Sequence, residues 1–278
     1  SNPFNMMTRH SFIIGVFCLL AGISATAQSK KIDIVFIGNS ITHGAGHAHP
    51  EATAPPVKAS EWLKKNLPGA VINYSNQGVS GATTVDFLPA TNRLFNNVIK
   101  AADGFKNDKD ATLVFSMMLG TNDSAIEGPN GSPVSPADYE KNVKVIIDRL
   151  LNDYPGCIIV LQHPIWYSPN THNGARYLAE GQARLQSYFP VLTGIAAGYQ
   201  RQGAQVYTGY TGGFKYFNQH PGLFIQEHVK AGTFQLHPNE KGAEQLGDSW
   251  GKAIRRVFLA KAQRFQTGAD LKPAKELR

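Results

Sequence analysis

Short apolar runs alternate along the chain with longer stretches in which apolar residues recur at helical spacing. Unbroken apolar runs of strand length are typical of strands that are buried on both faces, as in a parallel sheet. The first run, Ile32 to Ile37, is rich in Ile, Val and Phe with Asp33 as its one polar residue, stops at Gly38 and leads into Ser40. The predicted strands are residues 32–37, 70–74, 111–119, 158–162 and 205–208.

The stretches between these runs predict helices, because their apolar residues fall three or four positions apart. Turn residues such as Pro68-Gly69 mark their ends. Proline lacks a backbone N–H, so we expect a break or a first turn at Pro89 and an interruption at Pro190. The predicted helices are residues 57–67, 84–101, 136–153, 175–202 and 239–261.

The alternation of strands and helices predicts the fold. Right-handed crossovers between successive parallel strands place helices on both faces of one sheet. We therefore expect an α/β fold of the doubly wound, flavodoxin-like type, a sandwich with about five parallel strands, in one domain over residues 28–278. Residues 209–236 have no clear period, and a long irregular stretch in a domain is usually a functional excursion or a wall of an active site.

The first 27 residues are excluded from this domain. They contain a basic Arg9, an apolar stretch from Phe12 to Ala21 and the small-residue pattern Ala25-Thr26-Ala27. This order is typical of a secretory signal peptide with its cleavage site. We expect the mature protein to begin at Gln28 and to be secreted or periplasmic.

A transmembrane anchor is the alternative for the same segment. The apolar stretch, residues 12–21, has only about half of the roughly 20 residues that a spanning helix needs. Cys18 has no small residue just before it, which a lipoprotein cleavage site would require, so we expect neither a lipid anchor nor a membrane anchor. Residues 1–5 precede Met6 and are expected to be an expression remnant.

Charge and cysteine content narrow the function further. The formal net charge is +7 at pH 7, and loss of the leader with its Arg9 would leave +6. The basic residues are scattered in pairs and in the tail from Lys261 to Arg278, without interleaved aromatics. This pattern is typical of a solvated surface and argues against nucleic-acid binding, while acidic glycans remain compatible with it. Cys157 is the only cysteine after the leader, which excludes an internal disulfide.

Polar residues of complementary chemistry follow the predicted strands. Ser40, Gly78 and Asn122 each lie just beyond a strand, at the edge where open α/β sheets place their ligands, and His237 precedes the last helix. A serine becomes a nucleophile when a base such as His237 takes its proton. Attack on an ester creates an oxyanion that needs fixed donors, for which we expect the backbone N–H groups of Ser40 and Gly78 and the amide of Asn122. Each residue alone also fits a cap, turn or loop, but their common position favours a site.

Four segments around these residues share a pattern with a known family. They are Gly38-Asn39-Ser40-Ile41-Thr42, Asn76-Gln77-Gly78, Gly120-Thr121-Asn122-Asp123, and His237-Pro238-Asn239 with Gly242. Together they resemble the sequence blocks of the SGNH or GDSL-type serine hydrolases, esterases and acylhydrolases, over about residues 32–255. The resemblance implies Ser40 as the nucleophile, His237 as the general base, Gly78 and Asn122 as oxyanion donors, and no cofactor.

Two positions depart from the family pattern. Asn39 replaces the aspartate of the first block and leaves the nucleophile in place. Phe234 stands three residues before His237, where the resemblance implies the acid of the triad, and a phenylalanine cannot orient an imidazole. Three alternatives stay open: a backbone carbonyl that leaves a Ser-His dyad, a carboxylate from elsewhere with Glu227 as the nearest upstream candidate, or a weakened or inactive relative.

Loop residues near the expected site are candidates for substrate binding. Aromatic rings and imidazoles beside a hydrolase site suit stacking on sugars, although Trp166 also fits a role in packing its own loop. His43 belongs to a group with His47, His49 and Glu51, but no second ligand cluster of recognised spacing accompanies it, so we expect no metal. The candidates are Asn39, His43, Trp166 and Tyr167.

The resemblance implies hydrolysis of a carboxylic ester through an acyl-enzyme on Ser40. Exported members of this size often resemble carbohydrate O-acetylesterases, so the expected partner is a small acylated substrate or an acetylated glycan. That step rests on analogy. Two alternatives stay open, a lipase or lysophospholipase-like acylhydrolase and a catalytically weakened relative that binds glycans.

Overall fold

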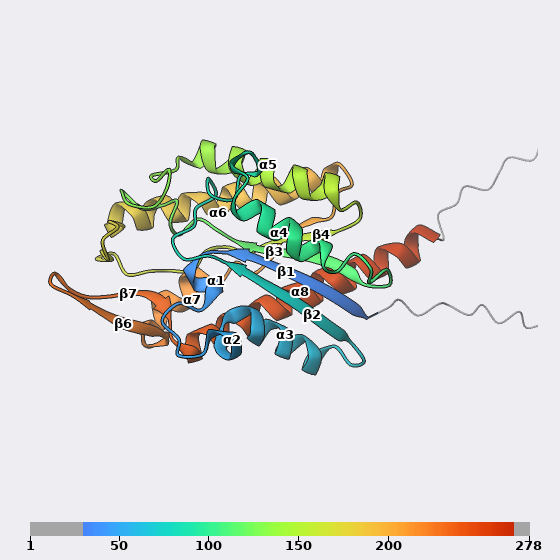
Figure 1. The fold of residues 1–278 in the computed structure, drawn as a ribbon, viewed down its shortest axis with the longest axis horizontal. Helices are drawn as coiled ribbons and strands as arrows, with labels where there is room; N and C mark the ends of the chain where they lie inside the picture. The colour runs from blue at the N-terminus through green and yellow to red at the C-terminus, as the bar shows by residue number, and fades with distance from the viewer. Residues whose placement is uncertain (1–29, 270–278) are drawn as a thin grey trace, which may run out of the picture.

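A central sheet of five parallel strands runs through the molecule in the order β2-β1-β3-β4-β5. The computed structural model describes residues 30–269, and Figure 1 shows this sheet between two layers of helices. The arrangement confirms the predicted doubly wound, flavodoxin-like sandwich. The strands are β1 (Lys31–Gly38), β2 (Val71–Gly78), β3 (Thr112–Met118), β4 (Ile158–Leu161) and β5 (Val206–Thr208).

Helices cover both faces of the sheet because successive side chains of a strand point to opposite sides. In β1, Val35 and Ile37 belong to the core on one face, and Ile34 and Phe36 belong to the core on the other. All four side chains are buried, as the unbroken apolar run predicts. The first face is covered by α4 (Leu94–Asp103), α5 (Pro136–Asp153) and α6 (Leu178–Arg201), and the second by α3 (Pro55–Asn66) and α8 (Glu240–Ala269).

Two predicted boundaries on the first half of the chain are wrong. β2 continues to Gly78 instead of ending at residue 74, because its residues pair with β1 along the whole strand. The predicted helix 84–101 is reduced to a 3-10 turn, η1 (Pro89–Thr91), and the separate helix α4. The left-handed backbone of Asn92, with a φ of 50°, separates the two.

The predicted interruption at Pro190 is also wrong, since α6 runs unbroken through it. Proline leaves the carbonyl of Gln186 without its usual donor. Both residues lie on the exposed side of the helix, where water can satisfy that carbonyl. Leu185 and Tyr188 on the opposite side are buried in the core, so packing holds the helix together across the proline.

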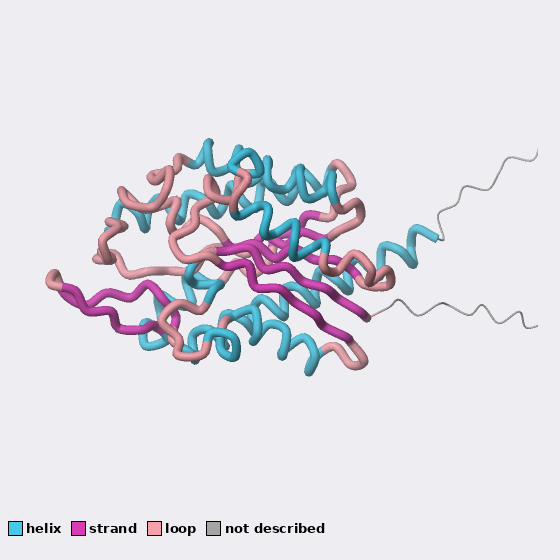
Figure 2. The backbone as a smooth tube through the Cα atoms, in the orientation of Figure 1, coloured by secondary structure: helices cyan, strands magenta, loops and turns pink. Residues whose placement is uncertain are grey.

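The stretch without a clear period, residues 209–236, is folded. It contains α7 (Gly213–Gln219), the turn η2 (Pro221–Leu223) and most of a hairpin. The hairpin pairs β6 (Phe224–Val229) with β7 (Gly232–Pro238) in an antiparallel sheet that is separate from the central one (Figure 2). Short elements and a register shift near Phe224 hide its period in the sequence. In Figure 1 the hairpin projects beyond the carboxyl ends of the central strands.

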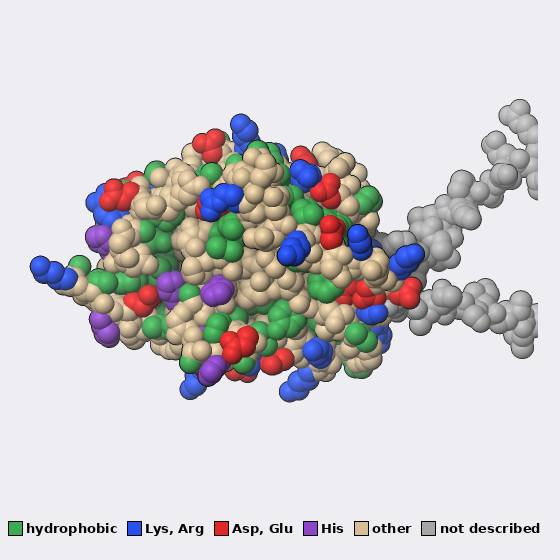
Figure 3. All heavy atoms as spheres, in the orientation of Figure 1, with side chains coloured by type: hydrophobic (Ala, Val, Ile, Leu, Met, Phe, Trp, Pro, Cys, Tyr) green, Lys and Arg blue, Asp and Glu red, His purple; other side chains and the backbone are tan. Residues whose placement is uncertain are grey.

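The surface agrees with the scattered charge of the sequence. Figure 3 shows basic and acidic side chains interspersed over one face of the molecule. No helix within residues 30–269 combines the length and the apolar character that a membrane crossing requires. The predicted signal peptide, with Cys18 and its cleavage site, lies outside the described residues.

Candidate active site

A cavity of about 620 Å³ opens at the carboxyl ends of the central strands, where the β6–β7 hairpin forms part of its wall. Side chains that are far apart in the sequence meet there. Ser40 follows β1, Asn122 follows β3, and His237 belongs to the hairpin. The lining residues that concern the chemistry are Ser40, Gly81, Asn122, Tyr177 and His237.

The turn after β1 places Ser40 at the start of the short helix α1 (Ser40–His43). Asn39 caps this helix, because its Oδ1 accepts a hydrogen bond from the Ile41 N–H over 3.0 Å. The first N–H groups of a helix have no partner within it, and the Ser40 N–H donates to no other atom of the described residues. Asn39 is fully buried and does not line the cavity, so this predicted substrate-binding residue is a helix cap instead.

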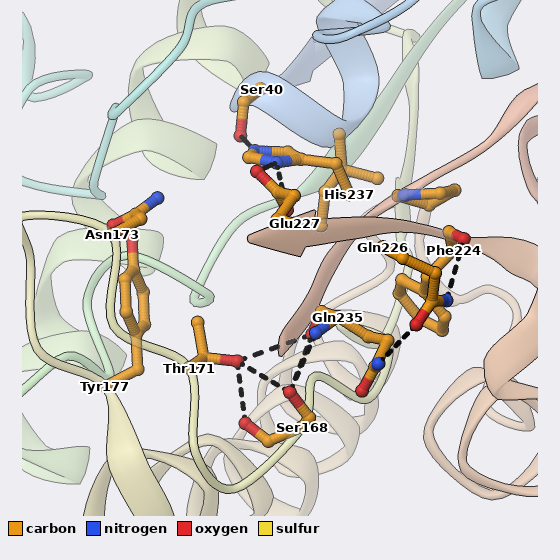
Figure 4. A network of polar contacts seen from close by, with 12 residues as sticks. Ser40, Ser168, Thr171, Asn173, Tyr177, Phe224, Gln226, Glu227, Gln235 and His237 are labelled. Atoms are coloured by element: carbon orange, nitrogen blue, oxygen red, sulfur yellow. Dashed lines mark hydrogen bonds and ion pairs between the residues drawn. The ribbon is translucent and has the colours of Figure 1, made fainter. Parts of the chain in front are cut away.

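The structure brings Ser40, His237 and Glu227 into one chain of hydrogen bonds (Figure 4). The distance from Ser40 Oγ to His237 Nε2 is 3.0 Å, and His237 Nδ1 lies 3.0 and 3.1 Å from the two carboxylate oxygens of Glu227. A carboxylate only accepts hydrogen bonds, so Nδ1 carries the proton and Nε2 accepts the Ser40 hydroxyl. This is the tautomer that a general base needs.

Glu227 reaches His237 from the other strand of the hairpin. Glu227 in β6 pairs with Phe234 in β7, three residues before His237. Phe234 is buried in the core beside Leu236. The neighbouring strand therefore supplies a carboxylate close to the position that the sequence leaves without one, and of the three alternatives the geometry matches the substitute acid.

Asn122 is held by two hydrogen bonds at the edge of the cavity. Its Nδ2 donates to the Ala82 carbonyl over 2.9 Å, and its Oδ1 accepts from the Tyr177 hydroxyl over 2.6 Å. An amide nitrogen carries two hydrogens, so one N–H remains for a ligand. Asn122 is 3% exposed and lines the cavity, as its predicted role as an oxyanion donor requires.

A buried carboxylate anchors the segment that carries Asn122. Asp123 is fully buried and accepts hydrogen bonds from the backbone N–H and the hydroxyl of Thr84. Burial raises the pKa of Asp123 from 3.8 to about 6, although the hydrogen bonds from Thr84 act in the opposite direction. Asn142 of α5 donates to the same Thr84 hydroxyl, which ties this network to the helical layer.

Gly78 was expected just beyond β2 as an oxyanion donor, but it is the last residue of β2. Its N–H donates to Asn76 Oδ1 over 2.9 Å, and it does not line the cavity. A Cβ atom at Gly78 would lie 2.4 Å from the His43 nitrogen, so this glycine allows α1 to pack on β2.

Gly81, three residues later, lines the cavity with a φ of +79°. Its N–H has no acceptor among the described residues. We therefore assign the backbone donor to Gly81 in place of Gly78. The signal in the sequence was the second glycine of Gly78-Val79-Ser80-Gly81, which becomes the loop glycine once β2 is known to continue to Gly78.

The other predicted substrate-binding residues also lie away from the cavity. His43 is exposed on α1 and does not contribute to the lining. Trp166 is 7% exposed and packs edge-on against Phe224, so it holds its loop against the core. Tyr167 is buried, and its hydroxyl lies 2.7 Å from Ser124 Oγ.

Four further polar side chains line the cavity, and none of them belongs to a recognisable sequence motif. The Asp86 carboxylate accepts a hydrogen bond from Asn130 Nδ2 over 2.9 Å and lies 3.5 Å from Arg93 Nη1. The Arg93 side chain is 62% exposed, so most of its donors face solvent. The four residues are Asp86, Arg93, Asn130 and Asn173.

Neither the predicted histidine group nor the remaining cysteine contributes to this site. Within residues 30–269, no three His, Cys, Asp or Glu side chains are grouped so that they could hold a metal ion. His47 instead bonds to Thr53 Oγ1 and the Pro238 carbonyl. Cys157 is buried elsewhere, and burial raises the pKa of its thiol to about 12.

Comparison with known proteins identifies the family of the chain. The model of the GDSL-like lipase/acylhydrolase family matches residues 36–245 of the chain. No curated protein sequence matches the chain.

Similar solved structures include a carbohydrate acetylesterase from Sinorhizobium meliloti, with 13% identity over 81% of this chain and 99% of that one and a TM-score of 0.53. A lipase/acylhydrolase from Enterococcus faecalis has 19% identity over 80% and 95% of the two chains, with a TM-score of 0.50. An alpha/beta hydrolase enzyme from the metagenome of Lake Arreo, Spain, has 22% identity over 82% and 94%, with a TM-score of 0.51. At these identities the similarity concerns the fold alone.

Proposed function

The chain belongs to the GDSL-like lipase/acylhydrolase family of carboxylic ester hydrolases, and from this premise we propose that it is a serine esterase that removes O-acetyl groups from carbohydrates. The observation that carries the proposal is the hydrogen-bond chain from Ser40 through His237 to Glu227 at the wall of the cavity. A nucleophile, a base and an acid in this order are the parts that acyl transfer requires.

Acylation begins when His237 Nε2 takes the Ser40 proton and Ser40 Oγ attacks the ester carbonyl. The negative charge on the former carbonyl oxygen is stabilised by the N–H groups of Ser40 and Gly81 and by Nδ2 of Asn122. Glu227 stabilises the imidazolium that forms beside it. His237 then returns the proton to the leaving alkoxide, and an acetyl group remains on Ser40.

Deacylation repeats these steps with water in place of the serine. His237 takes a proton from the water as its oxygen attacks the acyl carbon, and the same three donors bind the second oxyanion. Collapse of this intermediate breaks the bond to Ser40 Oγ, which regains the proton from His237. The product is a free carboxylic acid.

The lining of the cavity supports a carbohydrate as the alcohol part of the ester. Asp86, Arg93, Asn130 and Asn173 offer carboxylate, guanidinium and amide groups. Groups of this kind form hydrogen bonds with the hydroxyls of a sugar. A long acyl chain would instead favour an apolar groove, whereas these four lining side chains are polar.

Export forms part of the same proposal. The segment before Gln28 has the order of a secretory signal peptide, and an extracellular or periplasmic enzyme would meet acetylated glycans directly. N-terminal sequencing of the protein recovered from an expressing bacterium tests this, because export predicts a mature chain that begins at Gln28. Recovery of the uncleaved chain in the cytoplasm would contradict export without affecting the esterase proposal.

The esterase proposal is tested by hydrolysis of p-nitrophenyl acetate, p-nitrophenyl octanoate and acetylated xylan by the protein and its Ser40→Ala variant. We expect acetate to be released from the first and the last, and we expect Ser40→Ala to lower kcat on the order of 10⁶-fold, as loss of a nucleophile does. The matched control is Ser80→Ala, because Ser80 also lines the cavity but does not contact His237.

Each other outcome selects a different function. Preference for the octanoate ester would indicate a lipase-like acylhydrolase. Binding of xylan without turnover in a folded protein would indicate a glycan-binding relative and would overturn the esterase. Equal losses in Ser40→Ala and Ser80→Ala would contradict Ser40 as the nucleophile.

A further inference from the structure

Tyr177 contacts the proposed oxyanion donor but not the nucleophile or the base. Its hydroxyl lies 2.6 Å from Asn122 Oδ1, in the buried wall of the cavity. We propose that Tyr177 is a positioning residue that fixes the Asn122 amide with its free N–H directed at the oxyanion. This inference rests on the proposed function and adds to it a residue that none of the sequence blocks contains.

The two hydrogen bonds of Asn122 permit only one orientation of its amide. In the observed orientation Nδ2 donates to the Ala82 carbonyl while Oδ1 accepts from the Tyr177 hydroxyl. A flipped amide would turn its oxygen toward the Ala82 carbonyl, leaving two buried acceptors face to face. Without the Tyr177 hydroxyl, Oδ1 would be a buried acceptor with no partner, which weakens the preference for the observed orientation.

The same hydrogen bond makes Asn122 a better donor. A hydroxyl that donates to Oδ1 draws electron density from the amide, and chains of hydrogen bonds polarise one another. The gain is largest when the third group in the chain is an oxyanion rather than a neutral carbonyl oxygen. Interactions that are stronger in the transition state than in the ground state raise kcat and leave KM unchanged.

Tyr177 is itself held in place. Its ring packs edge-on against Tyr167, and its backbone N–H donates to the Thr171 carbonyl over 3.2 Å. Thr171 belongs to a hydroxyl network with Ser168 and the backbone of Gln235, two residues before His237 in β7 (Figure 4). The loop that ends at Tyr177 is therefore tied to the strand that carries the base.

The Tyr177 hydroxyl stays protonated and keeps its role as a donor. Burial raises the pKa of Tyr177 above its usual value, and the negative charge of Glu227 raises it further. Asn122 Oδ1 has no hydrogen to give, so the direction of the hydrogen bond is fixed.

The matched control is the neighbouring Tyr167. It is buried like Tyr177, and its hydroxyl makes one comparable hydrogen bond, of 2.7 Å to Ser124 Oγ. Tyr177→Phe and Tyr167→Phe each remove one buried hydroxyl from the same cluster, but only the first change frees the Asn122 amide. A purely structural role would give the two variants similar losses of stability and similar kinetics.

The experiment is a double-mutant cycle on hydrolysis of p-nitrophenyl acetate by the full chain. We expect Tyr177→Phe to lower kcat roughly tenfold to hundredfold at constant KM, less than the 10²–10³ that loss of the donor itself costs. Tyr167→Phe should keep the kcat of the wild type. In an Asn122→Ala background, Tyr177→Phe should cause no further loss, because the amide through which Tyr177 acts is gone.

Two results would overturn the inference: an unchanged kcat in Tyr177→Phe, or an equal loss of kcat with and without Asn122. If Tyr177→Phe does not fold, replacement of Tyr177 by 3-fluorotyrosine keeps the hydroxyl and makes it a stronger donor. This replacement should change kcat in protein that retains Asn122 and should have no effect in Asn122→Ala. An unchanged kcat in protein that retains Asn122 would contradict the proposal. Absence of Ser40-dependent activity in the wild type would instead overturn the proposed function.

Discussion

The two halves of the site are built on different kinds of support. Ser40 and Asn122 follow inner strands of the central sheet, which are buried on both faces. His237 and Glu227 belong to a two-stranded hairpin, and their side chains are 15% and 25% exposed. The proposed nucleophile and oxyanion donor are thus held by the deep core, and the proposed base and its acid are held by the pairing of two strands.

This difference shows which site residues must occupy a fixed position in the sequence and which can come from another segment. The carboxyl ends of parallel strands meet at one edge, so a nucleophile that follows β1 always arrives there. In a hairpin, the residues of two strands lie opposite one another. Glu227 of β6 reaches His237 of β7 across this pairing, and both of its carboxylate oxygens lie within 3.1 Å of Nδ1. A carboxylate can therefore come from the strand opposite His237, whereas Ser40 is placed at the edge of the sheet by the end of β1.

Apart from loss of the proposed nucleophile, the largest expected effect comes from removing the carboxylate that the hairpin supplies. In Glu227→Gln, the amide no longer carries the charge that stabilises the imidazolium, and its N–H can select the wrong tautomer of His237. Loss of a triad carboxylate lowers kcat by about 10⁴ in a serine protease. We expect a loss of this order in steady-state hydrolysis of p-nitrophenyl acetate.

Glu127 offers the control for this change. It also forms an ion pair, with Arg176, but it lies outside the hydrogen-bond chain of His237. Glu127→Gln should keep the kcat of the wild type. An unchanged kcat in Glu227→Gln would show that a Ser-His dyad suffices and that the contact with Glu227 is incidental.

The next effect concerns packing around Ser40 and Asn122, the half of the site that the central sheet supports and that we call the sheet-borne half. A Cβ at Gly78 would lie 2.4 Å from the His43 nitrogen and 2.9 Å from the Asn39 carbonyl oxygen, and backbone atoms cannot turn away as side chains do. Overpacking of this kind costs about 3 kcal/mol. We therefore expect Gly78→Ala to lower the free energy of unfolding by about that amount, measured by urea denaturation.

Gly81→Ala is the comparison that separates the two glycines. A Cβ at Gly81 would meet no atom within 4 Å, so the cost is limited to the left-handed backbone, about 1 to 2 kcal/mol. If Gly78→Ala proved the milder change, α1 would not pack on β2 as described. The reassignment of the backbone donor from Gly78 to Gly81 would then lose its structural reason.

Much of the sheet-borne half could be predicted from the sequence, because apolar runs mark inner strands and the strand ends locate Ser40 and Asn122. The end of β2 could not, since β2 is an edge strand and its polar residues after Tyr74 stay in the ladder. That shift moved the donor to Gly81.

The hairpin was hidden for a different reason. Glu227 was only the nearest upstream carboxylate, because pairing between two strands is a tertiary property that no local pattern encodes. The aromatic pair Trp166 and Tyr167 failed as a prediction on similar grounds. An aromatic ring in a loop fits substrate stacking and loop packing equally well, and only the folded structure shows that both rings are buried.

The last effect separates the carboxylates of Asp123 and Glu227 by their response to pH. Burial raises the pKa of Asp123 from 3.8 to about 6 in the folded protein. Between these values the folded state binds more protons than the unfolded state, so this group makes the free energy of unfolding fall as pH rises, by up to about 1.4 kcal/mol per pH unit. Asp123→Asn removes that contribution, and its stability relative to the wild type should rise across the window in urea denaturation at several pH values. Parallel stability curves for the two proteins would contradict the buried charge at Asp123. When Glu227→Gln is added to both proteins, the difference between their stability curves should stay the same. Glu227 contacts His237 and makes no contact with Asp123, which anchors the segment of Asn122.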